Sequence, residues 1–190
     1  MPGIYALGHS TRSIAEFVEL LHHYGVTTLA DIRTIPRSRH NPQFNRADLE
    51  ASLLRENIRY VHLPRLGGLR RGLGKASPNT AWRNASFRGY ADYMQTEEFA
   101  RGLAELLALA VNGPVALMCA EALPWRCHRS LVADALLARG IGVQEIQSAR
   151  RVTPHRLTPF AHVEGEHITY PGEAANVEPN ESIGTESTQS

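Results

Sequence analysis

The chain has only two cysteines in 190 residues, and they do not form a Cys-x-x-Cys pair. Two cysteines are too few for a disulfide framework, so a small disulfide-stapled secreted domain is excluded and a reducing compartment is the simpler expectation. No apolar run approaches the roughly 20 residues that a membrane span needs. The N-terminus lacks a basic segment followed by an apolar stretch, so no signal peptide is expected. We therefore expect a cytoplasmic protein without a membrane partner.

Lysine is nearly missing too, since only one of the 20 basic residues is a lysine. The net charge of +1 hides two blocks of opposite sign. Between Arg33 and Arg88, twelve basic and three acidic side chains give a net charge of +9, whereas six glutamates and no lysine or arginine follow from Glu164 to the end. Blocks of one sign repel themselves and are uncommon without a counter-charge. The positive block predicts an anionic partner, a nucleotide or nucleic acid, with a compositional bias toward arginine as the alternative explanation.

Apolar, β-branched runs alternate with amphipathic runs along a chain that is 43% hydrophobic and can bury a sizeable core. The runs typical of strands cover 4–7, 26–32, 58–63, 114–118 and 141–146. Helices are expected after Ser13, Asn45 and Thr96, which can cap them, and over 130–138. This order predicts one α/β domain over 1–160, with a mostly parallel, twisted sheet of about five strands and helices on both faces. Residues 161–190 read as a largely disordered acidic tail.

Polar side chains follow four of the predicted strands at the point where each strand ends. Ligands of open parallel sheets bind beyond the carboxyl ends of the strands, so we expect these side chains to converge on one rim. The predicted catalytic residues are Glu121 and Asp31, as an acid–base pair, with His9 and His128 to orient the ligand or relay protons. The predicted ligand-binding residues are Ser10, Arg33, Arg37, Arg39, Arg65, Arg126 and Arg129. A structural Asp31–Arg33 ion pair remains the alternative for those two residues.

Both cysteines lie in one segment, 119–129, together with a carboxylate, a histidine and two arginines. Cys119 ends an apolar strand and can be a small buried hydrophobe. Cys127 lies near the start of the next helix, where the helix dipole and neighbouring cations are expected to lower the pKa of its thiol. Zinc held by both cysteines and a histidine would need a loose spacing, so no metal is predicted. A phosphatase loop is excluded, because the position six residues after Cys119 is Trp125 rather than arginine.

Five short motifs together resemble one known family. They are Gly8-His9-Ser10-Thr11-Arg12, Asp31-Ile32-Arg33-x-x-Pro36, Pro42-x-Phe44-Asn45, Leu66-Gly67-Gly68, and Cys119-x-Glu121 followed by Cys127-His128-Arg129. Over about residues 3 to 155, the chain resembles the bacterial and archaeal "domain of unknown function 488" family (DUF 488). The resemblance implies an α/β domain with the rim described above, and association with nucleic acid or modified nucleotides has been suggested for relatives.

Three functions are compatible with these residues. The first is a hydrolase-like enzyme that acts on a nucleotide or nucleic acid through the polar rim. The second is a nucleic-acid-binding module without catalysis, and the third is a thiol-based redox protein that uses Cys119 and Cys127. No cofactor is predicted, because the glycine-rich segment 67–75 lacks the spacing of a nucleotide-binding P-loop.

Overall fold

The computed structural model describes residues 3–172 of the chain. The predicted tail beyond residue 172 lies outside the described residues. Among the helices of the described part, none combines the length and the apolar character that crossing a membrane requires.

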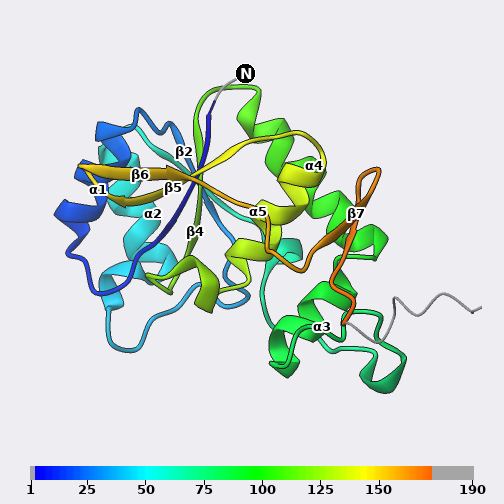
Figure 1. Ribbon diagram of the computed structural model, residues 1–190. Helices are drawn as coiled ribbons and strands as arrows, with labels where there is room; N and C mark the ends of the chain where they lie inside the picture. Colours follow the sequence, from blue (N-terminus) through cyan, green and yellow to red (C-terminus); the bar gives the residue numbers. More distant parts are fainter. Residues whose placement is uncertain (1–2, 173–190) are drawn as a thin grey trace, which may run out of the picture.

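A six-stranded sheet lies at the centre of the molecule, in the order β3-β2-β4-β1-β5-β6 (Figure 1). The strands are β1 (Ile4–Gly8), β2 (Thr28–Asp31), β3 (Arg59–His62), β4 (Val115–Cys119), β5 (Val143–Ser148) and β6 (Arg151–Pro154). The first five strands are parallel, and only β6 runs antiparallel to its neighbour β5. Every residue of the central strand β4 is buried, as its apolar sequence predicts for a strand covered on both faces. The predicted α/β class is confirmed.

Helices cover both faces of the sheet (Figure 1). They are α1 (Ile14–His23), α2 (Arg46–Arg55), α3 (Ala85–Tyr93), α4 (Glu97–Ala110) and α5 (Arg129–Ala138). Alternate strand residues supply two cores: Leu7 and Met118 pack with α1 and α2, whereas Ala6 and Leu117 pack with α4 and α5. This division follows from the two-residue period of strand side chains.

The predicted helix starts are confirmed, with one difference in how a cap works. Ser13 and Glu16 form a complete capping box at α1, and the Thr96 side chain accepts a hydrogen bond at the start of α4. Asn45 precedes α2 as expected, but its side chain accepts from the backbone N–H of Ser38 at 2.8 Å instead of capping the helix. Asn45 therefore fixes the loop that follows β2.

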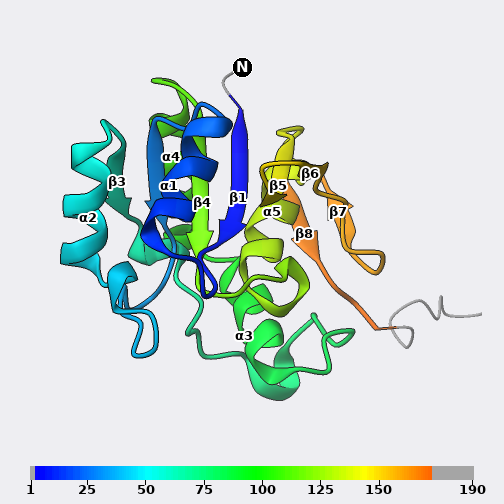
Figure 2. The ribbon, with the colours of Figure 1, turned by 90° about the vertical axis from the view of Figure 1, so that its left-hand side faces the viewer.

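The C-terminal part of the fold corrects the sequence reading. Disorder was expected from residue 161, but β7 (His162–Glu164) and β8 (His167–Thr169) form an antiparallel hairpin. Figure 2 shows β8 beside α5, which it contacts. Ile168 and Tyr170 are buried, and the Tyr170 hydroxyl donates to Asp134 of α5 at 2.9 Å. Because the hairpin is part of the described fold, the predicted domain boundary at residue 160 is too early. The sequence did not indicate the hairpin because two buried side chains are too few to produce a recognisable apolar pattern.

Candidate functional site

The carboxyl ends of β1, β2 and β4 meet at one edge of the sheet. Gly8 is paired with Cys119 and Asp31 with Met118, so the three chain segments leave the sheet side by side. Beyond the sheet, the N–H of His9 donates to the carbonyl of Cys119 at 2.9 Å. Gly8 has no room for a side chain, because a Cβ atom there would lie 1.7 Å from the carbonyl oxygen of Glu121. The first and fourth strand ends are thus locked together.

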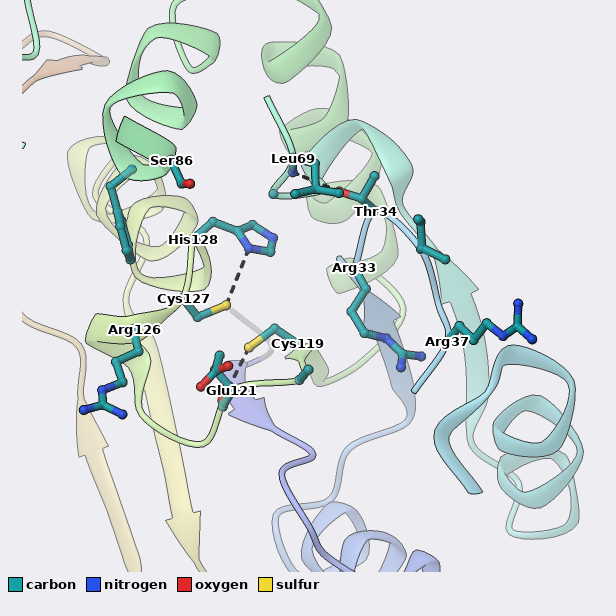
Figure 3. A pocket seen from close by; sticks show the side chains of 14 residues that line it. Arg33, Thr34, Arg37, Leu69, Ser86, Cys119, Glu121, Arg126, Cys127 and His128 are labelled. Carbon is teal, nitrogen blue, oxygen red and sulfur yellow. Dashed lines mark hydrogen bonds between the residues drawn. The ribbon is translucent and has the colours of Figure 1, made fainter. Parts of the chain in front are cut away.

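A cavity of about 360 Å³ opens at this edge (Figure 3). Both thiols lie on its wall together with Glu121 and His128. The remaining lining residues are Arg33, Thr34, Ile35, Arg37, Gly68, Leu69, Ser86, Phe87, Ala120 and Arg126. The cavity therefore places two sulfur atoms among mostly uncharged side chains.

Cys119 ends β4 and is held by the first residue of α5. Arg129 is 1% exposed, and its Nη1 atom lies 2.8 Å from the Cys119 Sγ atom and 3.0 Å from the carbonyl oxygen of Glu121. Burial raises the pKa of the Cys119 thiol, but the neighbouring Cys127 thiol and the positive charge of Arg129 together outweigh burial. The pKa of Cys119 is therefore held below its ordinary value.

The pKa of Cys127 is raised, which corrects the expectation that it is lowered. The adjoining Cys119 sulfur, followed by burial, raises the pKa of Cys127 well above the ordinary value. Figure 3 shows the two sulfur atoms directed toward one another. The helix start does contribute, since the N–H of Arg129 donates to Cys127 Sγ at 3.4 Å. The thiolate beside Cys127 outweighs this contribution.

His128 offers an acceptor for the Cys127 proton. The His128 Nε2 atom donates to the carbonyl of Ile32 at 2.9 Å, so its Nδ1 atom, 3.5 Å from Cys127 Sγ, is the unprotonated nitrogen. Burial lowers the pKa of His128 to about 4, so the ring is neutral at neutral pH. Gly68 allows this placement, because a Cβ atom there would lie 2.5 Å from His128 Nδ1.

The predicted acid Asp31 lies behind the cavity rather than on its wall. The Asp31 carboxylate is fully buried and accepts hydrogen bonds from the Arg33 side chain at 2.9 and 2.6 Å and from the Tyr60 hydroxyl at 2.7 Å. This is the structural ion pair that the sequence left open. His9 is also buried and stacks on Phe44 with ring centroids 4.2 Å apart, so neither it nor Asp31 lines the cavity.

The predicted ligand-binding arginines are brought together only in part, since Arg33, Arg37 and Arg126 line the cavity. Arg65 forms salt bridges with Glu98 and Glu105, and neither Arg65 nor the exposed Arg39 lines the cavity. Arg37 and Arg126 do line it, but Figure 3 shows their guanidinium groups pointing outward on opposite sides. Ser10 follows β1 in a turn with a positive φ of 50° and does not line the cavity.

Several lining residues escaped the sequence reading. Ser86 and Phe87 come from α3, a helix that the sequence did not predict, and Thr34 and Leu69 come from loops. The hydrogen bond from Leu69 N–H to Thr34 Oγ1, at 3.0 Å, joins these two loops and could not be read from composition. Within residues 3–172, no group of three or more histidine, cysteine, aspartate or glutamate side chains is arranged to hold a metal ion.

A comparison of the chain with models of known protein families agrees with the resemblance that the sequence motifs indicate. A model described as "Domain of unknown function DUF488" matches residues 13–136, about two thirds of the chain. The chain belongs to this family. The part that matches the DUF488 model contains Cys119, Cys127, His128 and Arg129, whereas the hairpin β7–β8 follows it. No curated protein and no solved structure matches this DUF488 chain.

Proposed function

We propose that this DUF488 protein is a thiol enzyme in which Cys119 is the nucleophile and Cys127 the second thiol of a dithiol–disulfide cycle. One observation carries the proposal: Arg129 Nη1 lies 2.8 Å from Cys119 Sγ, and Figure 3 shows the Cys127 sulfur directed toward the same atom. The thiolate is the nucleophilic form of cysteine, and a neighbouring cation is the usual means of stabilising it. Arginine keeps its charge at any pH that a folded protein meets, so this stabilisation is permanent.

The reaction that fits two adjacent thiols is exchange with a disulfide. The Cys119 thiolate attacks one sulfur of a substrate disulfide, the substrate S–S bond breaks, and the first substrate thiolate leaves. Cys127 then attacks the Cys119 sulfur, forms the Cys119–Cys127 disulfide and releases the second substrate thiolate. The Cys127 proton leaves with a released thiolate, and His128 Nδ1, 3.5 Å from Cys127 Sγ, is placed to accept it on the way. The protein dithiol is oxidised and the substrate disulfide is reduced.

The cavity wall indicates what the substrate carries. Ile35, Leu69 and Phe87 present apolar surface, and Arg37 and Arg126 add positive charge at two sides of the opening. A substrate with an apolar body and an anionic group fits this lining best, as electrostatic complementarity favours such an encounter. A cytoplasmic location would keep the dithiol reduced between turnovers.

The direct test is to oxidise the reduced protein with a small disulfide reagent and identify the products by mass spectrometry. Wild-type protein is expected to form the Cys119–Cys127 disulfide, whereas Cys127→Ser should stop at a mixed disulfide on Cys119. Cys119→Ser should react more slowly than either, because burial still raises the pKa of Cys127 when Cys119 is gone. The proposal fails if both single variants react at the rate of an ordinary exposed cysteine.

Hydrolysis of a nucleotide or nucleic acid is the second candidate, and one observation favours it. Glu121 lines the same cavity, two residues after Cys119, and its side chain is exposed to solvent. A carboxylate in this place can act as a general acid or base on a bound substrate. Glu121→Gln should then abolish hydrolysis and leave ligand binding intact. Unchanged turnover would remove Glu121 from the mechanism, and steeply salt-dependent binding without turnover would indicate a non-catalytic nucleic-acid module.

A further inference from the structure

Cys119 is one end of a chain of buried groups that carry charges of alternating sign. Arg129, which contacts the Cys119 sulfur, has its Nε atom 3.5 Å from Glu145 Oε2 on β5. The other oxygen of Glu145 lies 3.3 Å from Nδ1 of His155, and His155 Nε2 lies 2.8 Å from Asp134 Oδ1. The order from the cavity inward is thiolate, cation, carboxylate, imidazole and carboxylate.

Every member of this chain is shielded from water. The exposed fractions of the side chains are 1% for Arg129, 6% for Glu145, 8% for His155 and 0% for Asp134. Buried charges interact strongly because water screens them little. A change of charge at Glu145 or His155 is therefore felt at Cys119.

Geometry makes Glu145 a competitor for Arg129. The Cys119 sulfur lies at one edge of the Arg129 guanidinium group and Glu145 at another. The Nε atom of Arg129 and both carboxylate oxygens of Glu145 lack a well-aligned hydrogen-bond partner. The Arg129–Glu145 contact is thus an attraction between charges rather than a bidentate, hydrogen-bonded salt bridge. His155 contacts the other oxygen of Glu145, and its positive charge partly neutralises that carboxylate.

His155 carries the positive charge that this order requires. Burial lowers the pKa of His155, but a hydrogen bond with Asp134 and the negative charges of Asp134 and Glu145 outweigh burial and raise the pKa to about 9. Asp134 also accepts from the hydroxyl of Tyr170, which joins the C-terminal segment to the chain of charges. Arg12 is a further cation, and its positive charge interacts with that of Arg129.

We propose that Glu145 and His155 are positioning residues that set, in opposite directions, how strongly Arg129 stabilises the Cys119 thiolate. The inference rests on the proposed function, because it concerns the reactivity of the nucleophile assigned there. Removing the Glu145 charge leaves Cys119 as the main anion beside Arg129 and favours the thiolate. Removing the His155 charge leaves Glu145 as a stronger competitor and disfavours the thiolate.

The test is a pH titration of Cys119, followed by the ultraviolet absorbance of the thiolate, in protein that carries Cys127→Ser so that one thiol titrates. The double variant with both cysteines changed to serine supplies the tyrosine background. Glu145→Gln should lower the titration midpoint and His155→Gln should raise it, each by about one pH unit. The combination should resemble Glu145→Gln alone, because His155 acts through Glu145. Glu166→Gln is the matched control, because it removes a surface contact to Arg139 of the same 3.5 Å length.

Opposite shifts are the signature, since damage to packing alone would move both variants the same way. Shifts of the same sign, or none in variants whose melting temperatures match the parent, would overturn the inference. If one variant does not fold, the sign of the shift in the other decides. A parent protein whose Cys119 titrates like a free cysteine would instead refute the proposed function itself, so the two failures are distinguishable.

Discussion

Replacing Arg129 by glutamine is the sharpest single test of the Cys119 thiolate. At 2.8 Å, full charges in a medium of effective dielectric constant about 20 would attract by about 6 kcal/mol, which is a ceiling. Glu145 shares the guanidinium from 3.5 Å, and measured hydrogen bonds to charged groups contribute about 1.5–3 kcal/mol. At about 1.4 kcal/mol for each factor of ten, the thiolate population at neutral pH should fall about 10- to 100-fold.

The assay is the rate of alkylation of Cys119 by iodoacetamide at neutral pH, with Cys127→Ser in the background. Arg129→Lys is the matched control, because it keeps the charge but cannot contact Cys119 and the Glu121 carbonyl through a planar fork. We expect Arg129→Lys to lie between the parent and Arg129→Gln. Circular dichroism must show that Arg129→Gln is folded, since the change leaves Glu145 buried with His155 as its remaining partner. A folded Arg129→Gln protein that alkylates as fast as the parent would refute the assignment.

Three further changes test the fold around the site. Because the pKa of His155 is raised, the folded state keeps the His155 proton to a higher pH than the unfolded state does. The resulting stabilisation is complete below pH 6.5 and is lost as the pH rises toward 9. The difference in unfolding free energy between the parent and His155→Gln should therefore shrink between these pH values, and a constant difference would contradict the ion pairs. Gly8→Ala should destabilise the protein by about 1–3 kcal/mol in urea unfolding, because its Cβ would meet the Glu121 carbonyl. Tyr170→Phe should cost about 1–3 kcal/mol by leaving Asp134 short of a buried donor, and an unchanged melting temperature would separate the C-terminal segment from the domain.

The five parallel strands could be predicted because each carries its own signal, whereas the mostly exposed β6 was missed. Runs such as 114–118 are apolar throughout, and caps such as Ser13 with Glu16 are local in sequence. α3 lacked such a signal, because Gly89 interrupts it. Gly89 is nevertheless required there, since a Cβ atom would lie 2.7 Å from the carbonyl oxygen of Arg70. That contact joins segments nineteen residues apart and is invisible to a local pattern.

The reactive end of the site was harder to predict, because it depends on where one side chain points. Arg129 looked like a ligand-binding arginine at a helix start. Side chains of a helix lean toward its N-terminus, and α5 begins at Arg129, so its guanidinium reaches back to the end of β4. The result is an arginine that binds the Cys119 sulfur and not an external anion. The competing anion, Glu145, lies on a strand expected to be ordinary core.

The positive block of the sequence has a different meaning in the folded protein. Arg33 is bound to Asp31, Arg65 to Glu98 and Glu105, and the Arg70 side chain donates to two carbonyls and stacks on Tyr93. Arginine suits such tasks because its planar group satisfies several acceptors at once. Two of the twelve basic residues, Arg33 and Arg65, thus have carboxylate partners among the described residues. If the cavity takes an anionic ligand, Arg37 and Arg126 at its opening would contact it, and changing these two residues together should weaken binding without altering the titration of Cys119.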